Sequence, residues 1–154
     1  KVSNMNDIEI TGGTKAKQEY ARSMVEFCIK KLMPRMKTLD IVVKLKKLGS
    51  DADGYCLRES SREYELEIDH TVGLRRMLET VAHEMVHVKQ YARNEMSDTA
   101  IQTKFYKWKD TLVPETTDYW DLPWEIEANG REVGLFIRWA HHTGNAKKHW
   151  ANIK

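Results

Sequence analysis

The sequence has no hydrophobic run long enough to cross a membrane, and it has almost no net charge. No apolar stretch approaches the roughly 20 residues that a transmembrane helix needs, so we expect a protein that is not embedded in a membrane. The formal net charge is only +2, and phosphate binding needs a concentrated basic patch, so overall charge does not indicate nucleic acid. With 41% hydrophobic and 31% charged residues, the composition is typical of a soluble globular protein.

Cysteines, repeats and linkers are also scarce or missing. The two cysteines, Cys28 and Cys56, lie far apart in the chain. We favour two buried thiols in a reducing cytoplasm, and a disulfide is the alternative. We expect neither to bind a metal. Without repeats or internal linkers, 154 residues predict a single domain over 1–154 with a core of its own. The chain begins with Lys1 rather than methionine, which indicates trimming or processing, including removal of a signal peptide as one alternative.

The chain is organised around the segment Thr80–Gln90. It contains two histidines four residues apart, His83 and His87, with Glu84 beside the first. On a helix with 3.6 residues per turn, such positions are neighbours about 6 Å apart on one side, which suits two Zn–N bonds of roughly 2.0–2.1 Å to one ion. This H-E-x-x-H arrangement is that of zinc peptidases, in which the glutamate is the general base.

The flanking residues favour a helix from about Thr71 to Asn94. Apolar residues recur along it at three- and four-residue steps: Leu74, Leu78, Val81, Met85, Val88 and Ala92. His83 and His87 fall on a different side from this apolar face, so burial in the main core does not explain them. The alternative is two surface histidines stacked by accident, and we favour the metal site.

A catalytic zinc site usually has three protein ligands and one open position for water, so a third ligand is needed. The best candidate segment is 121–132, which begins like a helix with Pro123 in its first turn. The predicted packing face of this helix consists of Ile126, Val133, Ile137 and Ala140.

Two glutamates of this helix compete for the role of third ligand. Glu127 falls on a polar side, where Arg131 makes an ordinary ion pair with it. Glu125 falls beside the small Ala128 next to the packing face, where a carboxylate can reach inward. We therefore favour Glu125 as the ligand, with Asn129 one turn later as a candidate to hold Glu125 or a histidine.

The combination of His-Glu-x-x-His with a later helix carrying Glu125-x-x-Ala128 resembles the gluzincin clan of zinc metallopeptidases. The small size, with a helix and a few strands before the motif helix, is similar to the minigluzincin and SprT-like peptidase domains of bacteria and bacteriophages. The resemblance implies that His83, His87 and Glu125 bind zinc and that Glu84 is the general base. SprT-like proteins use a third histidine where this chain has glutamates, and many gluzincins have an aspartate where this chain has asparagine.

The remaining periodicity predicts an α+β fold, with a small antiparallel or mixed sheet packed on the motif helix and further helices before and after it. The resemblance implies that this fold is zincin-like. Strands are predicted over 8–11, 41–47, 55–58 and 62–69, and the other helices from Thr14 to Pro34, over 97–109 and from Pro123 to Gly144. We interpret 49–54 as a hairpin turn rather than a calcium loop, and 112–124 as an irregular aromatic loop that either walls a cleft or fills the core.

The strand over 62–69 alternates Tyr64, Leu66 and Ile68 with four carboxylates on the other face. We favour a solvated sheet face. The alternative, which the resemblance implies, is an exposed strand edge near the motif helix that receives substrate by strand addition. An acidic face over the cleft would then favour basic peptides.

Two further features bear on function. Tyr119 is a candidate to stabilise an oxyanion, in competition with Tyr91, His141 and His142. The segment 131–154 interleaves basic residues with tryptophans, which can bind nucleic acid. We favour a solvated helix end there, because helix C-termini favour cations.

Taken together, these patterns predict a cytoplasmic zinc metallopeptidase that acts on peptides or proteins. Zinc would polarise the substrate carbonyl and lower the pKa of its bound water to roughly 7, and Glu84 would take the proton of that water and deliver it to the leaving amine. Two alternatives stay open. One is a nucleic-acid-associated module with a structural zinc whose fourth position is filled by His141 or His142, and the other is a protein-interaction domain with an unused site.

Overall fold

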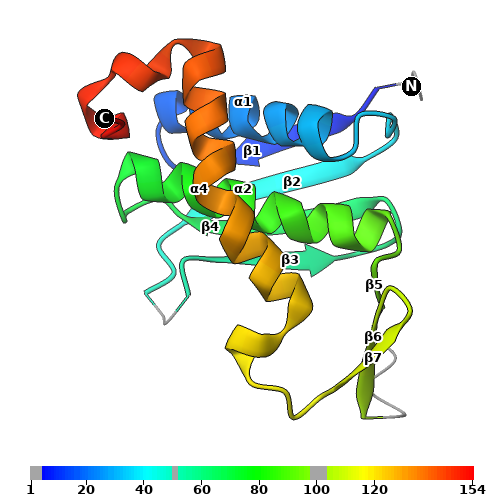
Figure 1. Cartoon of the computed structure of the whole chain (residues 1–154). Coiled ribbons are helices and arrows are strands. Elements are labelled where there is room, and N and C mark those ends of the chain that lie inside the picture. Colours follow the sequence, from blue (N-terminus) through cyan, green and yellow to red (C-terminus); the bar gives the residue numbers. More distant parts are fainter. Residues whose placement is uncertain (1–4, 50–51, 98–103) are drawn as a thin grey trace.

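The computed structural model describes residues 5–49, 52–97 and 104–154 (Figure 1). Its α+β fold follows the predicted order of elements over most of the chain. The elements are β1 (Asp7–Thr11), α1 (Lys15–Leu32), β2 (Asp40–Lys46), β3 (Gly54–Arg58), β4 (Glu63–Asp69), α2 (Leu74–Ala92), β5 (Met96–Ser97), β6 (Phe105–Trp108), β7 (Thr111–Pro114), η1 (Tyr119–Asp121), α4 (Pro123–Thr143), η2 (Asn145–Lys147) and η3 (His149–Ala151).

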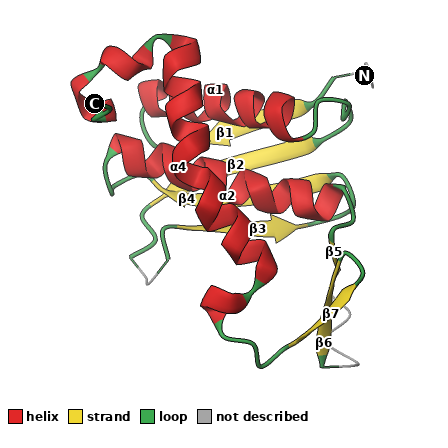
Figure 2. Ribbon diagram, viewed as in Figure 1, coloured by secondary structure: helices red, strands yellow, loops and turns green. Residues whose placement is uncertain are grey.

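The main sheet is mixed. Its strand order is β1-β2-β4-β3, in which β1, β2 and β4 are parallel and β3 is antiparallel to β4. Figure 2 shows α1 and α2 side by side against one face of this sheet, with α4 crossing over α2. The exposed edge near α2 is therefore β3, and the acidic strand β4, which we considered for that role, lies inside the sheet.

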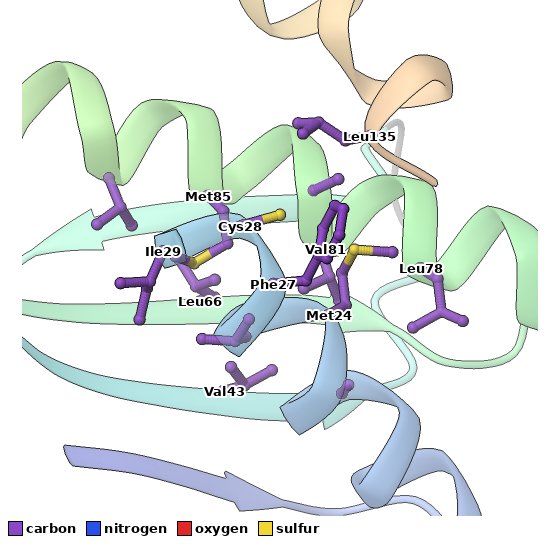
Figure 3. Packing of buried hydrophobic residues seen from close by; sticks show 14 of the residues in the cluster. Met24, Phe27, Cys28, Ile29, Val43, Leu66, Leu78, Val81, Met85 and Leu135 are labelled. Carbon is purple, nitrogen blue, oxygen red and sulfur yellow. The ribbon is translucent and has the colours of Figure 1, made fainter. Parts of the chain in front are cut away.

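The core lies between the sheet and the helices. Because side chains alternate along a strand, every second residue of β2 and β4 faces the helices and is buried. Figure 3 shows how these side chains meet those of α1, α2 and α4. The labelled residues are Met24, Phe27, Cys28 and Ile29 of α1, Val43 of β2, Leu66 of β4, Leu78, Val81 and Met85 of α2, and Leu135 of α4.

The outer face of β4 carries paired charges. Glu65 lies 3.1 Å from Lys44, and Glu67 lies 3.0 Å from Lys46, so this face is the charged sheet surface that we favoured. Asp69 departs from the predicted pattern because it is buried. Its carboxylate accepts hydrogen bonds from the backbone N–H and the hydroxyl of Thr71, and these bonds lower its pKa to about 2.

Helix α2 is surrounded by the rest of the fold. Every residue from Met77 to Gln90 is buried, because the sheet, α1 and α4 cover its different sides. The side of α2 that carries the histidines therefore faces α4 rather than open solvent.

The predicted packing face of α4 is right only in its second half, where Ala140 is buried and Ile137 is partly buried against the core. Ile126 and Val133 are 57% and 42% exposed. The buried residues of α4 are Trp124, Ala128, Glu132, Leu135, Phe136, Trp139 and Ala140. Large aromatic side chains bury more area than Ile or Val, so the face that contains Trp124, Phe136 and Trp139 is the one that packs. The helix ends as predicted at Gly144, which has a left-handed φ of 78°.

The helix predicted over 97–109 is also wrong in its described part, and residues 98–103 lie outside the described residues. Strands β5, β6 and β7 form a small antiparallel sheet, and β7 occupies part of the segment predicted to be irregular. Lys104 and Lys109 flank β6 with left-handed φ values of 63° and 52°. Met96, Val113 and Trp124 form a second apolar cluster that joins this sheet to the start of α4.

Neither cysteine takes part in a disulfide. Burial raises the pKa of both the Cys28 and the Cys56 thiol, so both are protonated and are poor nucleophiles.

In the ranges that the structure describes, no helix is long and apolar enough to cross a bilayer.

Candidate metal centre

The two histidines of α2 and the first turn of α4 meet at one point. The rings of His83 and His87 lie 5.0 Å apart. His83 Nε2 is 3.2 Å from one carboxylate oxygen of Glu125, and His87 Nε2 is 3.2 Å from the other. One ligand atom from each of the three residues lies within 4.8 Å of the others. Two imidazoles and one carboxylate are a donor set that catalytic zinc sites use.

The packing of α4 on α2 explains why Glu125 is the glutamate that arrives there. Ala128, fully buried, lets the two helices approach, and Trp124 is anchored in the second apolar cluster. Glu125, between them, is thereby directed at the histidines. Glu127 points elsewhere: its carboxylate accepts from Lys89 at 2.6 Å and from Arg131 at 3.0 Å.

The other ring nitrogen of His83 is held by a buried carboxylate. His83 Nδ1 donates to Glu132 Oε1 at 2.8 Å, and the second oxygen of Glu132 pairs with Arg76. This fixes the ring so that Nε2 is the atom presented to the centre. Sequence reasoning did not assign this role to Glu132, although its position two turns after Glu125 on the same side of α4 was a usable signal.

His87 is oriented by a neutral side chain instead. Its Nδ1 donates to Gln90 Oε1 at 2.7 Å. The amide nitrogen of Gln90 donates to the backbone oxygen of Trp124 at 2.9 Å and to Glu127 Oε1 at 3.0 Å. Because both of these partners can only accept, they fix which way the amide faces, and Nε2 of His87 is left for the centre. Glu127, the rejected third ligand, thus supports a ligand through Gln90.

The charges of the cluster stabilise one another against burial. Burial lowers the pKa of His83, but hydrogen bonds to Glu125 and Glu132 outweigh this effect and raise the pKa to about 9. Burial likewise opposes a charged His87, whose pKa is nevertheless raised by Glu125 and Glu84. The same histidines hold the pKa of Glu125 below its ordinary value, although burial acts to raise it. A divalent cation at this point would replace the protons on the two Nε2 atoms.

Glu84 lies beside this cluster and is 5% exposed. Burial raises its pKa, and the nearby histidines only partly offset the effect. Space for its carboxylate comes from Gly54 at the start of β3: a Cβ there would lie 3.3 Å from Glu84 Oε2 and 2.6 Å from Thr80 Cγ2. A buried carboxylate with a raised pKa binds a proton more strongly than an ordinary carboxylate does.

A cleft opens beside the cluster. It has a volume of about 310 Å³ and is lined by β3 residues, by Tyr91, Met96 and Trp124, and by the cluster itself with Glu84. A second hollow of about 360 Å³ adjoins it and shares His83 and Glu84. In Figure 1 this region lies where the start of α4 passes α2 beside β3.

The aromatic loop before α4 contributes Tyr119. Its hydroxyl donates to Glu125 Oε1 at 2.9 Å, and Asn129 Nδ2 lies 3.5 Å from the same hydroxyl. Asn129 therefore contacts Tyr119, whereas the holding role that we predicted for it is filled by Glu132 and Gln90. Because Tyr119 also lines the cleft, this loop forms part of the wall, which was one of its two predicted interpretations.

The structure does not bring the remaining candidates to the ligands in the same way. Tyr91 lines the cleft one turn after His87. His141 and His142 are exposed at the far end of α4, about 24 Å along the helix axis from Glu125. Neither of them is placed to fill a coordination position or to contact an oxyanion at the cluster.

No family model, curated protein or solved structure matches this chain. A function for this chain therefore has to be inferred from the arrangement of the site. In that arrangement two imidazole nitrogens and a carboxylate converge, and a second carboxylate faces the same cleft.

Proposed function

We propose that the protein is a zinc-dependent metallopeptidase with a zincin-like fold. In this proposal His83, His87 and Glu125 bind the ion, and Glu84 is the general base. The observation that carries it is the convergence of the three ligand atoms within 4.8 Å in a cleft that Glu84 also lines. A base beside the centre supports hydrolysis rather than a purely structural ion.

Each residue has a distinct task. Zinc bound by these ligands would polarise a substrate carbonyl and lower the pKa of a water molecule. Glu84 takes the proton of the attacking water and returns it to the leaving amine, for which its raised pKa is suited. Tyr119 carries a hydroxyl next to Glu125. By giving up its hydrogen bond to Glu125, this hydroxyl can donate to the oxygen that becomes negative. Glu132 and Gln90 keep both imidazoles in the ligating orientation.

The substrate in this proposal is a peptide or an unfolded protein segment. The cleft runs beside Gly54 and Cys56 of the edge strand β3, so an extended chain can lie along it. A folded protein would have to present a loop or a terminus to reach Glu84, which is 5% exposed.

The alternative of a structural zinc needs a fourth protein ligand. In the part of the chain that the structure describes, the candidate group contains His83, His87 and Glu125, and His141 and His142 lie at the far end of α4. This geometry favours the catalytic assignment. For segment 131–154, a solvated helix end stays the prediction and nucleic-acid binding its alternative.

The decisive experiment compares wild-type protein with Glu84→Gln. We expect one zinc per chain in both, measured by elemental analysis, and a loss of about 10²- to 10⁴-fold in the rate of casein cleavage for the variant. Glu65→Gln, on the outer face of β4, is the matched control and should cleave like wild type. Wild-type protein that binds no added zinc, or Glu84→Gln at wild-type rate, would refute the proposal.

A further inference from the structure

The cleft has two chemically different ends on either side of the cluster. The end toward the C-terminus of α2 is lined by Tyr91, Met96 and Trp124, and we call it the aromatic end. The end toward the N-terminus of α2 is lined mainly by polar side chains that include Asp53 and Arg76, with the exposed Trp120 at its side, and we call it the polar end. Both ends include His83, Glu84 and Tyr119.

The walls of the aromatic end are fixed by buried contacts. Met96 and Trp124 are 8% and 7% exposed and belong to the second apolar cluster. The ring of Trp124 lies 5.3 Å from Tyr106 and 6.2 Å from Trp108, so the small sheet holds it in place. This end is consequently a preformed hollow, as ligand sites usually are.

Tyr91 forms the side of the aromatic end nearest to the sheet. Its ring stacks on Tyr64 of β4 at 6.3 Å, and the guanidinium of Arg58 lies 5.7 Å from its centre. These contacts hold the ring one turn beyond His87 on α2.

Away from the cluster, the described lining of the aromatic end carries no formally charged side chain. Among the residues that the structure describes, neither lysine nor arginine lines it, and the carboxylates in its lining, Glu84 and Glu125, stand at the cluster. A charged substrate side chain placed there would lose its hydration without a compensating contact, whereas an apolar one would gain from leaving water.

The polar end differs because its charges are already paired. Arg76 binds Asp53 at 2.9 Å, Glu79 at 3.4 Å and also Glu132. Its guanidinium is therefore satisfied within the protein. A substrate side chain at this end meets paired polar groups and the ring of Trp120, which is 68% exposed. Such open surroundings discriminate less between residue types than a buried hollow does.

We infer that the aromatic end is a substrate subsite for one bulky apolar or aromatic side chain, an inference that rests on the peptidase function proposed above. This end borders His87 and Glu84 directly, and an extended chain advances about 3.3–3.6 Å per residue. The side chain that fills this end therefore belongs to a residue that flanks the cleaved bond. The residue on the other side of that bond lies at the polar end.

The test is to digest a denatured protein mixture with zinc-loaded enzyme and to identify the cleavage sites by mass spectrometry. We expect phenylalanine, tyrosine, leucine and methionine to exceed glycine, aspartate and lysine by about tenfold or more at one flanking position, and no such preference at the other. Uniform cleavage without preference at either position would overturn the inference and leave the peptidase function standing.

A variant links the preference to the hollow itself. Met96→Trp fills the aromatic end, so cleavage should shift toward sites with alanine or serine at the selective position, with zinc content unchanged. Leu112→Ala, on the exposed outside of the small sheet, is the control and should keep the wild-type preference. If Met96→Trp does not fold, Tyr91→Ala, which enlarges the same hollow, should shift cleavage toward tryptophan.

Different outcomes test the subsite and the peptidase function. Met96→Trp or Tyr91→Ala with an unchanged preference would overturn the subsite alone. Wild-type protein that holds zinc and cleaves no peptide would overturn the peptidase function, and the subsite with it.

Discussion

Two glutamates only two residues apart on α4 serve one centre in different ways. Glu125 faces the histidine nitrogens at 3.2 Å, whereas Glu127 is held by Lys89 and contacts the centre only through Gln90. The separation follows from helix geometry, because positions two apart point to nearly opposite sides. Substitutions of Glu125 and of Glu127 can therefore test the ligand and its support separately.

We predict that Glu125→Ala raises the zinc dissociation constant by more than Glu127→Ala does. Glu125→Ala removes one of the three proposed ligands. Glu127→Ala leaves all three in place and affects the centre through the Gln90 amide, so for this variant we expect about a tenfold loss of zinc affinity. Competition with a chelator of known affinity measures both values. Arg131→Ala is the control, because Arg131 contacts Glu127 without touching Gln90, and it should leave affinity unchanged. Equal affinities for the two glutamate variants would contradict the assignment.

The same scale shows what the sequence alone could predict of the site. His83, Glu84 and His87 form a local pattern, so their common face follows from helix spacing alone. Glu125 was chosen over Glu127 for its position beside Ala128, and it is the one that reaches the cluster. Glu132 and Gln90 were not predicted as supports, although Glu132 lies two turns after Glu125 and Gln90 three residues after His87. Their contacts with His83 and with Trp124 appear only once α4 crosses α2.

At the scale of elements, the approach of β3 to α2 gives the cleft its shape. The strand begins at Gly54, where a Cβ would lie 2.6 Å from Thr80 Cγ2 and 3.1 Å from the backbone oxygen of Glu67. A side chain at this position cannot be accommodated without moving either the strand or the helix. The glycine therefore sets the distance between the edge strand and Glu84.

We predict that Gly54→Ala destabilises the fold by about 1–3 kcal/mol, the usual cost of overpacking, and also lowers peptidase activity. The matched control is Gly130→Ala in the interior of α4, where an added Cβ meets nothing within 4 Å. That change should stabilise the protein by up to about 1 kcal/mol, since alanine is the better helix former. Urea unfolding of both variants measures the difference, and a neutral Gly54→Ala would contradict the close approach.

Elements also show where sequence patterns fail. The β6 residues Phe105–Trp108 were assigned to a helix because apolar residues there also fit helical spacing. Their strand conformation depends on pairing with β5 and β7, which lies outside any local window. On α4, the packing face was assigned from Ile126, Val133, Ile137 and Ala140, and the first two are exposed. Tryptophans that reach two separate apolar clusters set the orientation of the helix instead.

At the scale of the whole molecule, α4 connects two apolar clusters across the candidate metal centre. Its second half packs into the main core through Phe136 and Trp139, and Trp124 at its start belongs to the second cluster. The hydrophobic periodicity predicted an α+β protein, but not the strand order β1-β2-β4-β3, because the parallel neighbours in this sheet are distant in sequence. An ion held by both α2 and α4 would tie the motif helix to the element that carries the small sheet.

This connection leads to a prediction about stability and pH. In the metal-free protein the pKa of His83 is raised to about 9, above the ordinary value of about 6.5. Its contribution to stability is therefore fully present below about pH 6.5 and is lost as the pH rises toward 9. Zinc would compete with the proton on Nε2 of His83, so zinc binding should strengthen as the pH rises over that same range.

We therefore expect the stability added by zinc to grow between pH 6 and pH 9. A ligand present at 100 times its dissociation constant adds about 2.7 kcal/mol to the free energy of unfolding. Urea unfolding with zinc and with chelator at each pH can therefore measure the gap, which is the difference between the two free energies of unfolding. Glu125→Ala should narrow the gap throughout, because it removes both a ligand and the carboxylate that helps to raise the pKa of His83. A gap that is independent of pH would mean that the ion does not displace protons from these imidazoles, and that zinc is held elsewhere.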